Sequence, residues 1–430
     1  MRTTSQKRLI TRSPVSKGNS LPTVSSDLPK SIWSLAPLLI GFTLYSGTLT
    51  IGGLVGPSFD FWPDSIGSIA TGNIILAVYA TALGYIAAKS GLNTVLMARF
   101  SFGEVGSRWV DFILGFTQIA WYAWGSAVIA DLLNKSIGVP FYLHWLTILI
   151  CTYLFSGIAY ISYRFMDWLS RIAVSITLFL MLWSLILGMS KVGGWQVFWL
   201  IQPSQALGWS EILTAIVGTF ISGGTQVSKW SRITINNRNN ITSILVAFFL
   251  LSGFLILCGA LSSLVYDNED IVQMMGQEKL FIWGLLLLSI NIWTSQDRRI
   301  STFSVTASQL FGIKERTILI LVGAIVAIIL GWGGVYKIFL PYLVFQGAFI
   351  PPIGGIIMSD YWLHRKGKFP SLDKKQPEFN WVGILTYFMA SAIAYFSPGI
   401  KPINGILAAI VIYFILSEII PFISNRLKSA

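Results

Sequence analysis

The sequence predicts an all-α integral membrane protein of about twelve transmembrane helices, because its apolar stretches are long, its basic loops alternate and two of its helices are glycine-rich. Apolar residues make up 54% of the 430 positions, and charged residues only 11%. A soluble domain carries about 25% charged residues, and one soluble core could not bury this much apolar surface. The lipid bilayer is therefore the expected solvent for most of the chain.

The predicted spans are the apolar stretches that are long enough to cross a hydrocarbon layer about 30 Å thick as helices. They cover residues 33–57, 66–88, 110–133, 142–162, 168–189, 208–227, 241–263, 280–297, 316–331, 336–360, 380–397 and 402–424. The ninth span is the hardest to delimit, because Gly331, Gly333 and Gly334 lie near its end.

The basic residues alternate from loop to loop and predict the orientation. Of the 30 Lys and Arg residues, 25 lie in the terminal segments or in loops that follow even-numbered spans. Basic loops stay in the cytoplasm, so both ends are expected there, with the protein in the cell inner membrane. Residues 1–30 and 426–430 are then cytoplasmic tails, the first of them disordered, around one transporter domain at 31–425. The net charge of +12 reflects this orientation, and no nucleic-acid partner is expected.

Two predicted spans, the first and the sixth, contain clusters of glycine. The clusters are Gly41, Gly47, Gly52 and Gly53 in the first span, and Gly218, Gly223 and Gly224 in the sixth. A helix can be interrupted in lipid only where protein or water satisfies its backbone. Matching interruptions five spans apart predict an inverted repeat, with one copy at about 33–189, the second at about 208–360 and two additional helices at about 380–424. The alternative is that these glycines only let helices pack closely.

The third and eighth spans carry polar side chains. Asn291, Thr294 and Ser295 recur at i, i+3 and i+4, so one helix face offers two hydroxyls near a backbone carbonyl. Oxygens of this kind can hold a sodium ion beside an interrupted helix, although Ser and Thr also bond to their own helix. Because no ionisable residue lies near the middle of a predicted span, we expect a neutral solute and no carboxylate proton relay.

Amide and aromatic side chains on the same spans suit a flat heterocycle. Gln118, Asn291 and Gln296 pair donors with acceptors. The rings of Tyr45, Trp121 and Phe220 could stack on a planar solute. The alternative is that the rings fill space between helices and that the amides join them. Cys151 and Cys258 lie inside spans and are interpreted as packing residues. No catalytic arrangement is recognised, so an enzyme is not expected.

Several motifs in register resemble the nucleobase-cation-symport family one over about residues 30–425. They are GFTLYSGTLTIGG from Gly41, FTQIAWYAWG from Phe116, TFISGGTQ from Thr219, LLLLSINIWTSQD from Leu285 and FIPPIGGIIMSDYW from Phe349. The resemblance implies the leucine-transporter fold, with two inverted five-helix repeats and two extra helices. It also implies a purine-type or pyrimidine-type substrate such as cytosine, and coupling to sodium or protons.

The resemblance also implies residue roles. A sodium ion would be held by the carbonyls of Gly41, Leu44 and Asn291 and the hydroxyls of Thr294 and Ser295. The base would stack between Trp121 and Phe220 with Tyr45 nearby, and its polar edge would meet Gln118, Thr219, Ser222, Asn291 and Gln296. This chain departs from the usual family residues at Tyr45, Thr219 and Gln296.

Arg298 is a further departure, because it lies one helical turn from Thr294 and Ser295, where a guanidinium could repel sodium or replace it. With Asp297 and Arg299 as neighbours, the favoured interpretation is a solvated ion pair at the helix end.

The predicted function is sodium-coupled symport of a neutral nucleobase by alternating access, with Gly47, Gly223 and Gly224 absorbing the movement. The alternatives are import of a thiamine-pyrimidine precursor, allantoin or a purine, with proton coupling or none. A sensor or a channel on the same scaffold is a further alternative. No cofactor besides the coupling ion is expected, and the protein is expected to be a monomer.

Overall fold

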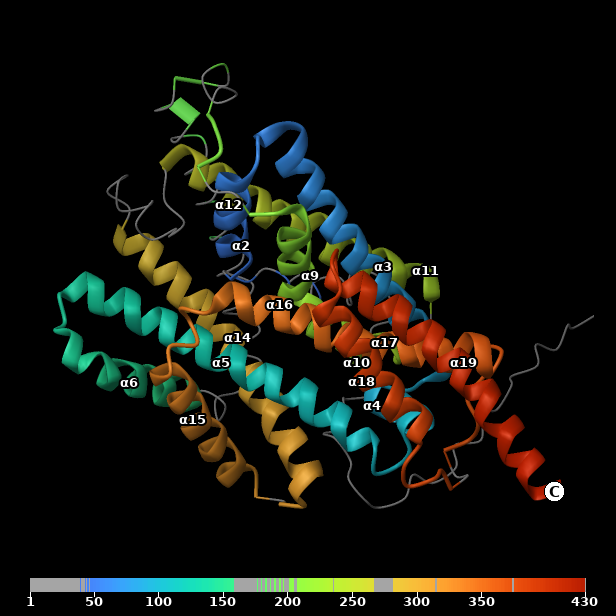
Figure 1. The fold of residues 1–430 in the computed structure, drawn as a ribbon. Helices are drawn as coiled ribbons and strands as arrows, with labels where there is room; N and C mark the ends of the chain where they lie inside the picture. The colour runs from blue at the N-terminus through green and yellow to red at the C-terminus, as the bar shows by residue number, and fades with distance from the viewer. Residues whose placement is uncertain are drawn as a thin grey trace, which may run out of the picture.

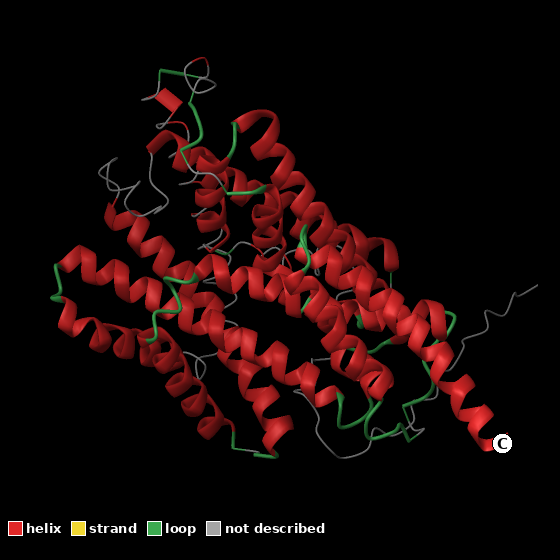
Figure 2. Cartoon of the chain, viewed as in Figure 1, coloured by secondary structure: helices red, strands yellow, loops and turns green. Residues whose placement is uncertain are grey.

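The chain folds into a bundle of helices in a computed structural model, and the described part contains no β-strand (Figures 1 and 2). The structure describes residues 47–157, 207–234, 236–266, 281–313, 315–372 and 375–429, with isolated residues between 39 and 45 and between 176 and 204. The predicted tail, 1–30, therefore lies outside the described residues, and so does the predicted fifth span, 168–189, apart from isolated residues.

Most predicted spans correspond to helices, with ends that differ by a few residues. The α-helices are α2 (Gly47–Val55), α3 (Ile66–Ser90), α4 (Thr94–Phe102), α5 (Ser107–Ile137), α6 (His144–Gly157), α9 (Trp209–Gln226), α10 (Ser228–Ser231), α11 (Asn237–Leu245), α12 (Ser252–Tyr266), α14 (Phe281–Phe311), α15 (Arg316–Trp332), α16 (Phe339–Phe349), α17 (Pro351–Met358), α18 (Trp381–Phe396) and α19 (Lys401–Ser429). The shorter or wider turns are η1 (Gly56–Ser58), η2 (Phe61–Ser65), η3 (Phe141–Leu143), η5 (Val246–Leu251) and η6 (Ser359–His364). The full span count stays a prediction.

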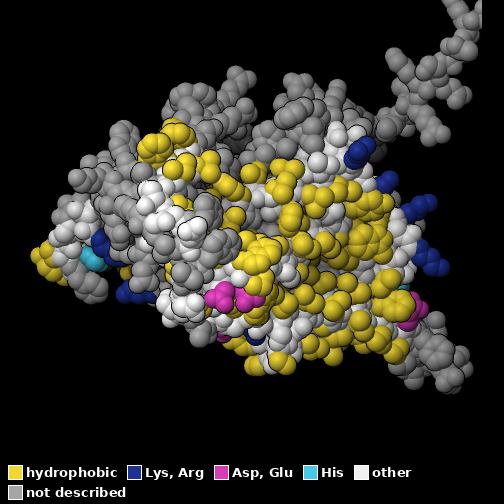
Figure 3. Space-filling view, turned by 90° about the horizontal axis from the view of Figure 1, so that it is seen from above, with side chains coloured by type: hydrophobic (Ala, Val, Ile, Leu, Met, Phe, Trp, Pro, Cys, Tyr) yellow, Lys and Arg dark blue, Asp and Glu magenta, His cyan; other side chains and the backbone are white. Residues whose placement is uncertain are grey.

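Apolar helices account for the bilayer prediction. Five helical segments in the described part are long and apolar enough to cross a membrane: Phe61–Ser90, Ser107–Ser136, Asn237–Val265, Phe339–His364 and Lys401–Ile419. In Figure 3, hydrophobic side chains cover much of the visible face, and most of the Lys and Arg side chains in view lie toward its margins. A surface of this kind is stable only against lipid or other protein.

The helices pair in a pattern that follows the predicted repeat. Helix α2 of the first span packs on α12 of the seventh, and α9 of the sixth packs on α3 of the second. Helices α5 and α14, the third and the eighth spans, pack on each other (Figure 1). An inverted repeat exchanges spans one to five with spans six to ten in order. This exchange turns the pair of spans one and seven into the pair of spans six and two, and it turns the pair of spans three and eight into itself. The exact repeat boundaries, 33–189 and 208–360, stay a prediction.

The predicted interruption of the first span is present, at Tyr45. Thr43 is helical, Tyr45 is not, and α2 begins at Gly47. The amide of Tyr45 donates to the carbonyl of Thr43 at 2.9 Å, and the amide of Thr48 donates to the carbonyl of Tyr45 at 2.9 Å. These bonds span two and three residues, whereas an α-helical bond spans four. The chain therefore turns tightly at Tyr45, and helix α2 begins beyond this turn.

The predicted interruption at the glycines of the sixth span is wrong. Helix α9 runs unbroken through Gly218 and Gly224 to Gln226, and the chain leaves the helix for only one residue, Val227, before α10. A Cβ atom at Gly218 would collide with the carbonyl of Leu343 in α16. Close packing of helices therefore explains this glycine, as the alternative interpretation proposed.

The eighth and tenth spans also differ from prediction. Helix α14 continues to Phe311, fourteen residues past the predicted end at 297, so Arg298 and Arg299 lie within a helix. The tenth span changes direction between α16 and α17 at Ile350, just before Pro351 and its neighbouring proline. Proline at the start of a helix lacks an amide that would have no partner there, which favours a new helix at this point.

Candidate substrate site

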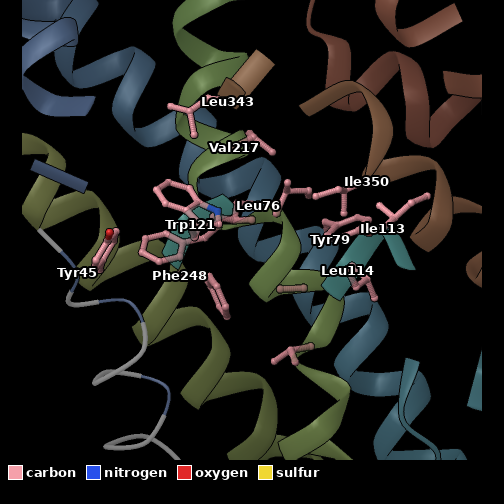
Figure 4. Close-up of a cluster of buried hydrophobic side chains, with 14 of the residues drawn as sticks. Tyr45, Leu76, Tyr79, Ile113, Leu114, Trp121, Val217, Phe248, Leu343 and Ile350 are labelled. Atoms are coloured by element: carbon pink, nitrogen blue, oxygen red, sulfur yellow. The ribbon is translucent and has the colours of Figure 1, made fainter. Parts of the chain in front are cut away.

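Four aromatic side chains gather around Trp121 of α5, and together with it they form what we call the aromatic cluster: Tyr45, Trp121, Trp124, Phe339 and Tyr342. The ring centroid of Trp121 lies 5.8 Å from Tyr45, 5.8 Å from Trp124, 5.9 Å from Phe339 and 5.5 Å from Tyr342, each nearly edge-on. Trp124 also stacks on Phe339 at 4.8 Å. The cluster joins the interruption of the first span to α5 and α16, and in Figure 4 Trp121 lies deep among side chains from several helices.

Gln346 of α16 contacts the polar edge of Trp121. The indole Nε1 donates to Gln346 Oε1 at 3.3 Å. Gln346 is fully buried, and its Nε2 has no hydrogen-bond partner among the described residues. A buried amide N–H₂ group without a partner is costly, so this group is a natural place for a ligand acceptor.

Ser222 of α9 connects α9 to α5 through a compact set of hydrogen bonds. Its hydroxyl lies 2.9 Å from Thr117 Oγ1 and accepts from the amides of Gln118, at 3.3 Å, and Gln226, at 3.2 Å. Thr117 in turn donates to the carbonyl of Leu114. A hydroxyl has one proton and two lone pairs, so Ser222 is saturated and would exchange a partner to meet a ligand.

The two predicted α9 contacts beside Ser222 have different surroundings. Phe220 is buried and lies edge-on to Phe248, with ring centroids 6.2 Å apart. The hydroxyl of Thr219 donates to the carbonyl of Ala215 one turn earlier in α9. Such a bond is the ordinary arrangement of threonine in a helix, so the role of Thr219 toward a base stays a prediction.

Gln296 of α14 lies against the backbone of α5. Its Nε2 donates to the carbonyl of Tyr122 at 2.7 Å and to the hydroxyl of Ser126 at 3.2 Å. Gly125 leaves room for this amide, because a Cβ atom there would lie 2.7 Å from Gln296 Nε2. The Oε1 of Gln296 is buried and has no hydrogen-bond partner among the described residues, so the role of Gln296 toward a base stays a prediction.

The predicted sodium ligands are described only in part. Gly41 and Leu44 lie outside the described residues, as does the side chain of Thr294. Asn291 is buried on α14, and the hydroxyl of Ser295 donates to the carbonyl of Ile292 at 2.7 Å. The helix positions of Asn291 and Ser295 agree with one shared face, and the ion site itself stays a prediction.

Arg299 corrects the expectation that no cation reaches the site. Its Nη1 donates to the carbonyl of Trp121 at 2.9 Å and to the hydroxyl of Tyr45 at 3.2 Å. The guanidinium carbon lies 4.1 Å from the ring centroid of Tyr45 and 5.2 Å from that of Trp121. A long side chain in a continuing helix can turn inward and lie on aromatic faces, as that of Arg299 does. The interpretation of Arg298 as part of a solvated ion pair stays a prediction.

Sequence reasoning missed Arg299, Gln346 and most of the aromatic cluster. Arg299 follows Asn291 and Ser295 at i+8 and i+4, so helical spacing would have placed all three on one face had α14 been extended past residue 297. Gln346 is a single amide in an apolar run, FLPYLVFQGAF, and polar residues in such runs tend to face protein. These two signals were present in the sequence.

An apolar helical bundle with an interrupted helix beside a buried aromatic and amide cluster is the architecture of a secondary transporter. The chain belongs to the family of permeases for cytosine/purines, uracil, thiamine and allantoin, whose pattern matches residues 26–415. It is therefore a membrane permease and not an enzyme.

Curated relatives agree with this assignment. Cytosine permease of Escherichia coli strain K12 is 30% identical over 391 residues, which are 91% of this chain and 92% of that protein. Cytosine permease of Escherichia coli O157:H7 is similar to the same extent.

Solved structures show the same fold. Mhp1 in an inward-facing conformation matches with a TM-score of 0.80 at 16% identity, covering 92% of this chain and 94% of Mhp1. Mhp1, a nucleobase-cation-symport-1 family transporter, also matches in a closed conformation with bromovinylhydantoin bound, at a TM-score of 0.77 and 17% identity over 90% and 92% of the two chains. A Na⁺-coupled sialic acid symporter matches at 0.59 and 12% identity, over 91% and 90%. These likenesses support the leucine-transporter fold.

Proposed function

We propose that this permease imports a planar, nucleobase-like heterocycle across the plasma membrane, and that the ring binds at Trp121. The aromatic cluster is the observation that carries the proposal, because a flat solute needs ring faces for stacking and nearby polar groups for orientation. Cytosine permeases among the relatives and a hydantoin-bound Mhp1 structure support this class of substrate. Both termini lie in the cytoplasm in this proposal, as the distribution of basic residues predicts.

Transport would proceed by alternating access. Only 4% of the surface of Trp121 is exposed, since Tyr45, Phe339 and Tyr342 surround its ring. A ligand can reach that ring only if the interruption of the first span or helix α16 moves away from α5. Opening toward one side at a time is the movement expected of this class of fold.

Sodium is the proposed coupling ion, held by Gly41, Leu44 and Asn291 through their carbonyls and by Thr294 and Ser295 through their hydroxyls. Hard oxygen ligands without a fixed charge suit this ion. A cation-independent mechanism is the second candidate, because the guanidinium of Arg299 already bridges Tyr45 and α5 one turn from Ser295. Arg299 would then supply the positive charge that an ion brings in a coupled carrier.

Uptake into proteoliposomes tests both proposals. Purified protein is given radiolabelled cytosine, uracil, a purine and allantoin, with a sodium gradient or with choline in its place. We expect concentrative uptake of at least one ring, dependent on sodium. Equal but only equilibrating uptake in sodium and in choline would favour the cation-independent candidate. No uptake of any ring above that of protein-free liposomes would contradict the proposed function.

A paired substitution locates the ion site. Thr294→Ala combined with Ser295→Ala should abolish sodium stimulation, because two of the proposed ligands are lost, while size-exclusion profiles and melting temperature stay close to the parent. Thr147→Ala is the matched control, because it removes a hydroxyl outside the proposed site. That hydroxyl donates to Asn134 Oδ1 at 2.6 Å. Sodium stimulation that survives the double substitution would refute these ligands.

A further inference from the structure

We propose that the substrate is an anionic, oxo-substituted heterocycle, recognised by Arg299 and Gln346. This inference rests on the proposed function and names the chemical class that the site takes. It departs from the neutral solute expected from the sequence, because that expectation assumed that no cation reaches the site.

The guanidinium of Arg299 is placed to meet a ring that stacks at Trp121. It lies 5.2 Å from the centroid of the Trp121 ring, and the Tyr45 ring lies beneath it at 4.1 Å. One of its nitrogens, Nη1, donates to both the Tyr45 hydroxyl and the Trp121 carbonyl. A guanidinium carries five N–H donors, so this arrangement leaves donors beyond those used to fix the side chain.

The charge of Arg299 has no acidic partner in the described part of the chain. Ion pairs there join Lys135 to Asp131, His364 to Glu418 and Arg365 to Asp360, and none includes Arg299. The side chain is half-buried, so it has lost part of its hydration. Aromatic faces compensate a cation only partly, whereas a carboxylate or an ionised ring gives charge-assisted hydrogen bonds.

Gln346 independently presents a hydrogen-bond donor at Trp121, as Arg299 does. Indole Nε1 can only donate, so its contact with Gln346 must use the amide oxygen, which settles the orientation of the amide group. The N–H₂ group of Gln346 is therefore the end without a partner, fully buried beside Trp121. An N–H₂ group in that position requires an acceptor.

Arg299 and Gln346 thus both present donors beside Trp121. A ring that presents carbonyl oxygens or a negative charge would satisfy the Arg299 and Gln346 donors together. A ring that presents an exocyclic amino group would set donor against donor, and unpaired buried donors discriminate more strongly than a missing methyl group does. Cytosine carries such an amino group, whereas dioxo and trioxo rings do not.

Binding and uptake of four probes test the proposal with the full-length protein in proteoliposomes at neutral pH. Orotate and urate are anionic oxo rings, uracil is a neutral dioxo ring, and cytosine is a neutral ring with an amino group. We expect orotate or urate to be preferred, uracil to follow and cytosine to be weakest. Preference for cytosine, or for uracil over both anions, would overturn the inference and leave the proposed function standing.

Substitution of Arg299 separates charge recognition from a structural role. Arg299→Gln should reduce uptake of the anionic probes at least about tenfold and uptake of uracil less than about threefold, because only the anions lose a charge-assisted bond. Arg299→Lys should restore part of the anion uptake. Arg316→Gln, which removes a cytoplasmic charge bonded to Ser301, is the matched control and should change neither.

Gln346→Leu is the second variant, and it keeps the test valid should Arg299→Gln fail to fold. It should narrow the preference for oxo rings over cytosine, with melting temperature recorded alongside. Equal loss for all probes in both variants would make these residues structural and overturn the inference. Failure of the parent protein to bind or transport any of the four probes would instead contradict the proposed function.

Discussion

The first and sixth spans occupy equivalent places in the fold, and both are rich in glycine, yet only the first is interrupted where the sequence predicted. At Tyr45 the chain leaves the helix, and the side chain there packs against Trp121, Trp124 and Arg299. At Gly218 the helix continues, and the missing side chain makes room for the carbonyl of Leu343. Glycine permits an interruption, but the surrounding contacts decide whether one forms.

The largest effect is expected at Gly218. Gly218→Ala would place a Cβ atom against the carbonyl of Leu343, and overpacking of this kind costs about 1–3 kcal/mol. We expect a lower melting temperature in detergent. Gly224→Ala is the matched control in the same helix, since its Cβ would meet Ala80 at an ordinary 3.4 Å. Alanine there should be neutral or stabilising by up to about 1 kcal/mol.

The same control tests whether Gly224 serves as a hinge. Transport by Gly224→Ala at the parent rate would agree with an unbroken α9. A folded Gly224→Ala protein that binds substrate but does not transport it would show that the sixth span must bend at this glycine, and the contrast between the two spans would then fail.

A smaller effect is expected at Gln296, which the family resemblance places at the base and the structure places between α14 and α5. Gln296→Ala removes its bonds to Tyr122 and Ser126, at a cost of about 2 kcal/mol to stability. The melting temperature should fall while the order of preference among substrates stays unchanged. An altered order of preference in a stable protein would return Gln296 to the substrate site.

The smallest effect is expected from Tyr45→Phe. This change removes the hydroxyl that accepts from Arg299 at 3.2 Å but keeps the ring beneath the guanidinium. Loss of one hydrogen bond costs about 1 kcal/mol, so the melting temperature should fall by a few degrees or less. Tyr45→Ala removes the cation–π contact as well and should cost more. Equal melting temperatures for the two variants would mean that the ring contributes nothing to the interruption.

Composition, hydropathy and charge distribution predicted most of the fold, because a helix in lipid must be long, apolar and internally bonded. Helix ends were harder to predict. Helix α14 extends to Phe311 through polar residues, and hydropathy cannot mark the end of a helix that leaves the membrane without unwinding. The bend before α17 could have been predicted, because Pro351 and the neighbouring proline favour the start of a new helix there.

The candidate site was predicted in its elements but not in its charge. The spans expected to form it carry Trp121, Tyr45, Gln118 and Ser222. Trp121 and Tyr45 lie in one cluster, and Gln118 donates to Ser222. The direction of the Arg299 side chain could not be read from hydropathy, since a long side chain reaches either solvent or the interior. Tertiary packing alone distinguishes these directions.

Trp121 is the residue proposed to bind the substrate ring, and its contribution to binding can be measured directly. The direct measurement is equilibrium binding of the preferred labelled heterocycle to purified Trp121→Ala, compared with Phe116→Ala, which removes an outward-facing ring with 41% exposure from the same helix. We expect Trp121→Ala to weaken binding at least about tenfold and Phe116→Ala to leave it unchanged, since a stacking contact contributes about 1–3 kcal/mol. Equal affinity in Trp121→Ala and the parent protein would contradict the account.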